Sequence, residues 1–183
     1  MAQKNRKDPK PAVKNIFLTG FMCAGKTTAG QILSRRLGLS LADSDALAEK
    51  TAGLPVAEIV ATRGLAAFRR IEAACVKELA AGRDRVIALG GGVYPSRRWK
   101  KTLAAGGTVV FLYCPWPELE KRLKSARGPR PLLKGPWARA RLRAKRLYNR
   151  RLAFYRKADI MVSTSGLSPA RAAALIIKRL AEK

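Results

Sequence analysis

Short apolar runs alternate with longer segments of helical periodicity along this chain. The apolar runs predict buried strands at residues 15–19, 39–42, 86–89, 108–113 and 160–163. Apolar residues spaced three and four positions apart predict helices at about 26–37, 46–51, 56–62, 65–81, 95–105, 117–125, 137–155 and from 169 onward. Regular alternation of strand and helix predicts a parallel α/β sheet with right-handed crossovers.

Glycine and proline mark the boundaries between these elements. Gly38 suits the position after the first helix, and Gly64 separates two helices. Gly106 and Gly107 predict a turn before the fourth strand. Residues 127–136 contain three prolines and two glycines, so we expect an irregular loop there.

One arginine stands out on the helix expected at 65–81. Its buried side is predicted by an apolar stripe formed by Leu65, Phe68, Ile71, Cys75 and Leu79. Arg69 falls at the margin of that stripe, while Arg70 lies on the side facing water. Arg69 is therefore placed to lean into a cleft, although from the pattern alone an ordinary surface arginine is the simpler interpretation.

Length and composition fit a single globular protein. The chain has 183 residues, 48% of them hydrophobic, and Lys, Arg or Pro interrupts every apolar run before it reaches membrane-spanning length. Residues 1–14 are basic and lack the apolar stretch of a secretory signal, which predicts a short disordered lead. Cys23, Cys75 and Cys114 lie far apart, and the chain has no histidine. We therefore expect one cytoplasmic domain at 15–183, with no zinc framework and no histidine-based catalysis.

The net charge of +26 is unusual for a protein of this size, and it indicates polyanionic partners such as nucleotides, phosphorylated metabolites or nucleic acid. Residues 121–157 contain fifteen Lys or Arg and no Asp or Glu. Such a run is compatible with a solvated helix face, a nucleic-acid surface or a lid over phosphates.

A phosphate-binding motif follows the first predicted strand. Residues 20–27 match the Walker A pattern, with Gly20 and Gly25 allowing successive N–H groups to face one anion at the start of a helix. Lys26 can reach the β- and γ-phosphates, and the Thr27 hydroxyl can hold Mg²⁺. The candidate ATP-binding residues of the loop are Cys23, Ala24, Gly25, Lys26, Thr27 and Thr28.

Acids follow the second strand and glycines follow the third. Asp43 or Ser44 can serve as an ordinary helix N-cap, but strand carboxyl ends in parallel sheets also bind ligands, and carboxylates there can steer Mg²⁺ and orient a hydroxyl. The triplet 90–92 suits either close approach of a ligand or a tight turn. The cationic loop 127–136 suits a lid that excludes water during phosphoryl transfer.

Together, the ordered motifs resemble the shikimate kinase family. The resemblance rests on residues 20–27, Asp43-Ser44-Asp45, 68–72, 90–92, 130–133 and 151–155, and it spans about residue 15 to the carboxyl end. It implies a three-layer P-loop kinase fold with a five-stranded parallel sheet in the order 2-3-1-4-5 and a lid at about 126–138. It also implies ATP-dependent phosphorylation of the shikimate 3-hydroxyl, a step toward chorismate and the aromatic amino acids.

The resemblance also implies roles for individual residues. Asp45 would position or deprotonate the attacking hydroxyl, while Arg69, Arg151 and the triplet Gly90, Gly91 and Gly92 would hold shikimate. Lys26, Asp45 and Arg130 would form the catalytic set, with Arg122 beside adenine and Arg130 on the ATP phosphates. Thr27 and Asp43 would hold Mg²⁺, the latter through water. The implied partners are ATP and shikimate, bound by a monomer.

Cys23 stands where members of this family usually have glycine, so we expect a crowded or strained loop that still binds ATP. Two other interpretations stay open at this point. One is a kinase of the same fold that acts on gluconate or a nucleoside monophosphate. The other is a P-loop-derived module that binds nucleic acid through residues 121–157, where aromatic residues are sparse.

Overall fold

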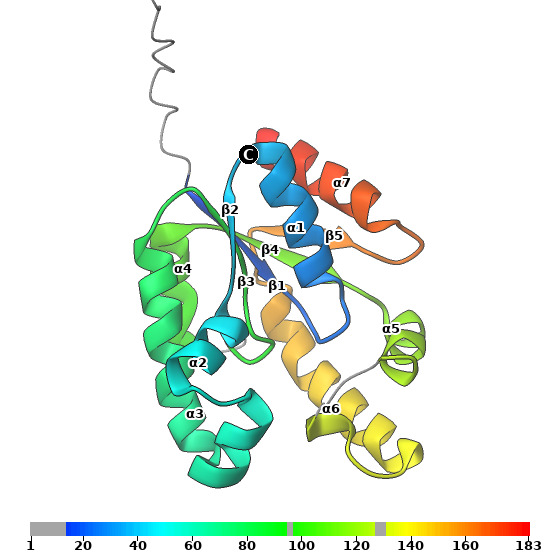
Figure 1. Cartoon of the computed structure of the whole chain (residues 1–183). Coiled ribbons are helices and arrows are strands. Elements are labelled where there is room, and N and C mark those ends of the chain that lie inside the picture. The colour runs from blue at the N-terminus through cyan, green and yellow to red at the C-terminus, as the bar shows by residue number, and fades with distance from the viewer. Residues whose placement is uncertain (1–13, 95–96, 127–130) are drawn as a thin grey trace, which may run out of the picture.

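The protein folds around one five-stranded parallel sheet, seen in a computed structural model that describes residues 14–94, 97–126 and 131–183 (Figure 1). The strands are β1 (Asn15–Thr19), β2 (Ser40–Asp43), β3 (Arg85–Ala88), β4 (Gly107–Tyr113) and β5 (Ile160–Ser163). Their order is β2-β3-β1-β4-β5, and every neighbouring pair is parallel. The predicted fold class and strand order are therefore confirmed.

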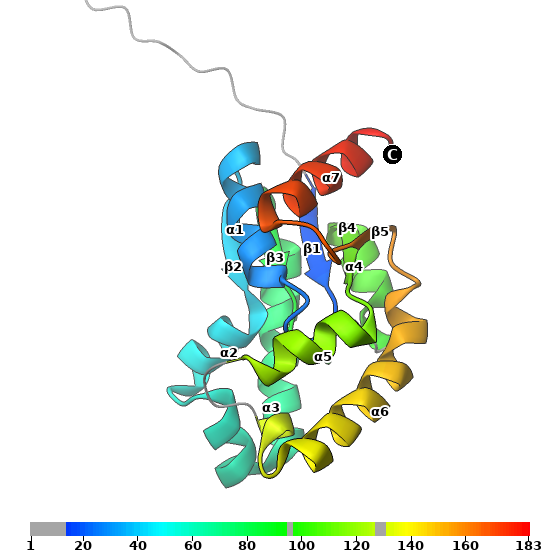
Figure 2. The same ribbon diagram turned by 90° about the vertical axis from the view of Figure 1, so that its right-hand side faces the viewer.

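Helices cover both faces of this sheet. They are α1 (Lys26–Leu37), α2 (Ser44–Ala52), α3 (Val56–Ala81), α4 (Lys100–Gly106), α5 (Trp116–Lys124), α6 (Trp137–Tyr155) and α7 (Pro169–Ala181). The 3₁₀ turns η1 (Arg97–Trp99) and η2 (Pro131–Leu133) complete the regular structure of the described residues. Helices α1 and α7 lie side by side on one face, and α3 and α4 lie together on the other (Figures 1 and 2). In the described part of the chain, no helix is both long and apolar enough to cross a bilayer.

Two separate hydrophobic clusters stabilise this arrangement. The main core joins the sheet to the helices on both faces and includes Ile16, Phe17 and Leu18 of β1. All five residues of β1 are buried, as is typical of a central parallel strand. A second cluster lies between α2 and α3, where Ala48, Ile59, Phe68 and Cys75 pack together. Helix α3 therefore packs on the main core with one side and on α2 with another.

Asn15 fixes how the sheet begins. Its buried side chain donates a hydrogen bond to the carbonyl of Gly82 over 2.7 Å and accepts one from the Arg85 amide over 3.2 Å, so it joins β1 to the start of β3. On the other side Asn15 pairs with Gly107, where any Cβ would overlap the Asn15 backbone. A side chain at position 107 would break this register.

Most predicted boundaries are confirmed, and the differences have simple causes. Gly38 ends α1 with a left-handed φ of 65°, and Gly64 interrupts α3 with φ 80° and ψ 162°. The predicted Gly106-Gly107 turn is wrong, because α4 runs through Gly106 and β4 begins directly at Gly107. Helix α5 begins at Trp116 rather than after Pro117, since proline is tolerated in a first turn. The loop expected to be irregular contains the 3₁₀ turn η2, while residues 127–130 and 1–13 lie outside the described residues.

Candidate active site

The phosphate-binding loop connects β1 to α1 at the carboxyl edge of the sheet. Gly20 has φ 147°, and a Cβ there would lie 2.7 Å from the carbonyl oxygen of Leu112. Gly25 caps α1 with φ 96° and has no neighbour that would block a side chain, so conformation rather than space favours glycine at this position. The loop therefore leads directly into the positive N-terminal end of α1, which is a favourable place for an anion.

Lys26 folds back over this loop. Its Nζ donates hydrogen bonds to the carbonyls of Gly20 over 3.0 Å and Phe21 over 3.2 Å. Burial lowers the pKa of Lys26, while the negative charges of Asp45 and Asp43 oppose that shift. The ammonium group therefore shares one crevice with both acids.

Asp43 joins the end of β2 to the phosphate-binding loop. Its Oδ1 accepts hydrogen bonds from the amides of Asp45, over 2.9 Å, and Ala46, over 3.3 Å, which makes it the N-cap of α2. Its Oδ2 accepts a hydrogen bond from Thr27 Oγ1 over 3.5 Å. Asp43 is thus both a helix cap and a neighbour of Thr27, so the two predicted metal residues lie together.

Asp45 lies deeper in the same crevice. Burial, together with the charges of Asp43 and Glu72, raises the pKa of Asp45 to about 6. Its carboxylate lies so close to Gly90 that a Cβ there would overlap it. Glycine at position 90 therefore leaves free the space that the Asp45 carboxylate occupies.

Arg69 and Glu72 form a tight ion pair on α3. Arg69 Nη1 lies 2.6 Å from Glu72 Oε2 and 2.8 Å from Oε1, and Glu72 is only 4% exposed. A Cβ on Gly92 would lie 2.6 Å from Nη1 of Arg69. Glu72 therefore fixes the Arg69 guanidinium against the glycine triplet.

Helix α6 reaches the triplet from the opposite side. A Cβ on Gly91 would lie 3.2 Å from Nη1 of Arg151, and the Tyr155 hydroxyl donates a 2.6 Å hydrogen bond to the Gly91 carbonyl. The Gly90 amide donates to Ser44 Oγ over 2.8 Å. The triplet is therefore held between α2 and α6, with Arg69 and Arg151 next to it.

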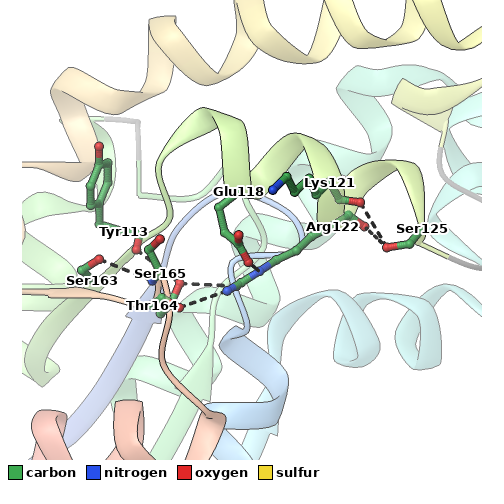
Figure 3. A network of polar contacts seen from close by, with 8 residues as sticks. All are labelled: Tyr113, Glu118, Lys121, Arg122, Ser125, Ser163, Thr164 and Ser165. Atoms are coloured by element: carbon green, nitrogen blue, oxygen red, sulfur yellow. Dashed lines mark hydrogen bonds and ion pairs between the residues drawn. The ribbon is translucent and has the colours of Figure 1, made fainter.

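Arg122 lies at the far end of the phosphate-binding loop. It lines a cavity of about 260 Å³ with Gly25, Thr28, Leu167 and Pro169. Its Nε lies 3.0 Å from Glu118 Oε1, and its Nη groups donate to the carbonyl and the hydroxyl of Thr164 over 3.0 and 3.4 Å (Figure 3). The guanidinium is therefore held in place beside a space next to the phosphate-binding loop.

The structure brings most of the predicted site residues together at one edge of the sheet, although their roles stay predictions. Arg130 lies outside the described residues. Glu72 and Tyr155 had no predicted role, and Ser44 was predicted only as a possible N-cap, a position that Asp43 takes instead. Glu72 could have been found, because it stands three positions after Arg69 on the same helix face.

A Walker A loop on the central strand of a 2-3-1-4-5 sheet, facing an acid and two arginines, defines a P-loop kinase of small molecules. The family model described as shikimate kinase matches residues 22–181. The chain belongs to the shikimate kinase family.

Individual relatives show the same similarity. The chain is 36% identical to a shikimate kinase of Caldicellulosiruptor bescii over 90% of this chain and 94% of the relative. It is 41% identical to one of Chromobacterium violaceum over 82% and 81% of the two chains. Among solved structures, the shikimate kinase of Acinetobacter baumannii in complex with shikimate superposes with a TM-score of 0.86 at 30% identity, covering 93% of this chain and 94% of that one.

Proposed function

We propose that this protein transfers the γ-phosphoryl group of ATP to the 3-hydroxyl of shikimate, giving shikimate 3-phosphate. The observation that best supports the proposal is the placement of Asp45, Arg69 and Arg151 around one glycine triplet, in a chain that belongs to the shikimate kinase family. An acceptor with a carboxylate and several ring hydroxyls fits two guanidinium groups and one acid.

On the acceptor side, we assign the carboxylate of shikimate to Arg69 and Arg151. Guanidinium groups pair with carboxylates in a fixed orientation, and Glu72 holds one of them in place. The Gly91 backbone approaches the ring closely. Asp45 orients the attacking hydroxyl and accepts its proton, and a pKa of about 6 keeps it mostly ionised at neutral pH while leaving it basic enough for that task.

On the donor side, we assign the triphosphate to the amides of residues 23–28 and to Lys26. Nucleotide binding would exchange the Lys26 hydrogen bonds to Gly20 and Phe21 for bonds to phosphate oxygens. Arg122 would lie beside the adenine, in the cavity next to Thr28. Arg130, which precedes η2 in the sequence, would contact the phosphates, as the family resemblance implies.

The residues at the end of β2 fit a magnesium ion bound together with ATP. Hydroxyl and carboxylate oxygens are the ligands this ion prefers, and Thr27 Oγ1 and Asp43 Oδ2 lie 3.5 Å apart. We assign Thr27 as a direct ligand and Asp43 as a ligand through water. When bound, the ion supplies charge neutralisation at the β- and γ-phosphates.

A coupled assay of ADP release tests the proposal with shikimate, gluconate and cytidine monophosphate as acceptors. We expect turnover with shikimate, and a kcat/KM at least about 10²-fold lower with gluconate and with cytidine monophosphate. The reason is that a site with specifically placed polar groups rejects an acceptor that leaves those groups without partners. Phosphorus NMR of the product then checks that the phosphate is on the 3-hydroxyl. Turnover only with gluconate or the nucleotide would replace shikimate as the acceptor.

We also propose that the enzyme is a cytoplasmic monomer whose domain spans 15–183. Its buried cysteines Cys75 and Cys114 are free thiols, in keeping with a reducing compartment. Light scattering coupled to size exclusion should give one mass near 20.0 kDa. A mass of twice that value would contradict the monomer.

A further inference from the structure

Four exposed arginines form one straight row on the outer face of α6. They are Arg139, Arg143, Arg146 and Arg150, called the cation row below. Their spacing of four, three and four residues keeps them within an arc of about 60° around the helix, at 100° per residue. The opposite face of the helix is buried through Ala140, Ala144 and Tyr148. The row therefore points away from the core, on a helix at the periphery of the molecule (Figures 1 and 2).

The charge of the cation row is not neutralised. Helix α6 contains no Asp or Glu, and among the residues that the structure describes, no carboxylate lies within 4.0 Å of these four guanidinium groups. Arg143 donates hydrogen bonds to the carbonyls of Leu132 and Lys134, which gives its N–H groups partners but does not neutralise its charge. The neighbouring Arg141 differs, because it pairs with Glu120. Four like charges held in line repel one another, and a polyanion lying along them would offset this repulsion.

The phosphoryl-transfer site does not use this row. Arg151 and Tyr155 are the residues of α6 that reach the glycine triplet, and they lie about 100° and 140° from Arg150 around the helix. The cation row is therefore exposed on the side of α6 that faces away from this site, where it can bind a partner other than the two substrates.

We propose that the cation row binds the phosphodiester backbone of a nucleic-acid duplex without reading its sequence. The row is about 17 Å long, since Arg139 and Arg150 are eleven residues apart at about 1.5 Å each. One strand of a duplex winds around the axis as it rises, so a straight row of this length follows only a short stretch of backbone and can meet about four phosphates of it. The charges and the length of the row thus match one continuous run of phosphates.

The side chains around the row favour a duplex over other polyanions. The aromatic residues of α6 are buried or half-buried, so unpaired bases would find no stacking surface. Leu142 is the one large apolar residue of α6 that is strongly exposed, at 50%. A single leucine is too little for a helix to insert into a membrane surface.

Fluorescence anisotropy with a labelled 20-base-pair duplex tests the proposal on the full chain. Over about 50 to 300 mM NaCl, log K should fall against log salt with a slope of about −3.6, or about 0.9 for each of four phosphate contacts. The slope should become about −0.9 in a triple variant that combines Arg139→Gln, Arg146→Gln and Arg150→Gln. The control combines Arg35→Gln, Arg36→Gln and Arg171→Gln, which removes equal charge from exposed positions on α1 and α7, and should keep the slope near −3.6.

Both triple variants should retain the turnover and thermal unfolding of the parent, which shows that they are folded. Restoring the three row positions as lysine should restore the steep slope, because lysine also binds phosphate as a point charge. Three results would overturn the proposal: an equal loss of slope in both triple variants, tighter binding of polyglutamate of matched charge, or tighter binding of phosphatidylglycerol vesicles. The second would point to an acidic protein partner and the third to a membrane.

Discussion

Asp45 is kept in an environment that disfavours its own charge. Its pKa of about 6 exceeds the ordinary value of 3.8 because the carboxylate is buried beside Asp43 and Glu72. The folded protein therefore binds this proton more tightly than the unfolded chain. The contribution of Asp45 to the free energy of unfolding therefore falls as pH rises from about 4 to 6. Above pH 6 the full cost of burying the charged carboxylate is present. The catalytic role that we propose for Asp45 therefore comes at the expense of stability.

Replacing Asp45 by asparagine should separate these two effects. We expect kcat to fall by about 10² or more, because the general base is lost. We expect the free energy of unfolding at pH 8 to rise by about 1 to 3 kcal/mol, with little gain at pH 4. Turnover measured at several pH values and denaturant unfolding at pH 4 and pH 8 measure the two effects. In the parent protein, kcat/KM should rise with increasing pH, with an apparent pKa of about 6. A variant with normal turnover would remove Asp45 from the mechanism.

Arg69 should matter for the acceptor and not for ATP. Replacing it by alanine should raise the KM for shikimate about 10- to 100-fold, since a charge-assisted pair with the carboxylate is lost, while the KM for ATP stays within about twofold. Glu72→Gln should have a smaller effect in the same direction, because the guanidinium remains but loses its ion pair. Arg70→Ala is the matched control, as Arg70 is the exposed neighbour on the same helix. Equal losses for both substrates would contradict this role.

Sequence reasoning at this scale succeeded where a residue type and its position agreed. The side of α3 on which Arg69 lies followed from the apolar stripe, although the stripe was wrong at Leu65, which is 56% exposed. The N-cap and the metal-site interpretations of Asp43 are compatible with each other. The support around these residues was not predictable. The contact between Tyr155 and Gly91 joins residues 64 positions apart, and periodicity within one element says nothing about such a contact.

The phosphate-binding loop contains one residue in a conformation that suits glycine better. Cys23 has φ 61°, in the left-handed region, where a side chain costs about 1 to 2 kcal/mol. The strain expected from the sequence at this position is therefore present.

Cys23→Gly and Cys23→Val should shift stability in opposite directions. Glycine relieves the strain but adds about 0.5 to 1 kcal/mol of chain entropy in the unfolded state, so we expect a net gain of up to about 1 kcal/mol. Valine should lower the free energy of unfolding by more than about 1 kcal/mol, because a β-branched residue fits this region poorly. Denaturant unfolding measures both, with the KM for ATP as the functional check. Equal stability of the two variants would show that the loop relaxes around any side chain.

At the level of elements, local pattern predicted nearly every strand and helix. The helix expected at 137–155 and the strand expected at 160–163 have the observed bounds. The junction of α4 and β4 was mispredicted, since two adjacent glycines normally indicate a turn. Here the close approach to Asn15 explains the glycine at 107, and that approach is visible only when β1 and β4 are paired.

The whole molecule has a net charge of +26, which works against compactness. Salt screens this repulsion, with a Debye length near 10 Å at 0.1 M. We therefore expect the thermal unfolding midpoint to rise by about 2 to 4 °C between about 20 and 200 mM NaCl, corresponding to about 1 kcal/mol. Calorimetry at the two concentrations measures the shift. A midpoint that falls with salt would mean that favourable ion pairs outweigh the repulsion.

The separate hydrophobic cluster between α2 and α3 has a consequence for how this kinase could change in evolution. Ala48, Ile59, Phe68 and Cys75 pack α2 against one side of α3, while another side of α3 packs in the main core. Substitutions at these four positions can change how α2 sits on α3 while the main core around the nucleotide half keeps its packing. Acceptor preference can thus change in evolution, or be transferred from a related kinase, while the ATP-binding part of the chain stays unchanged.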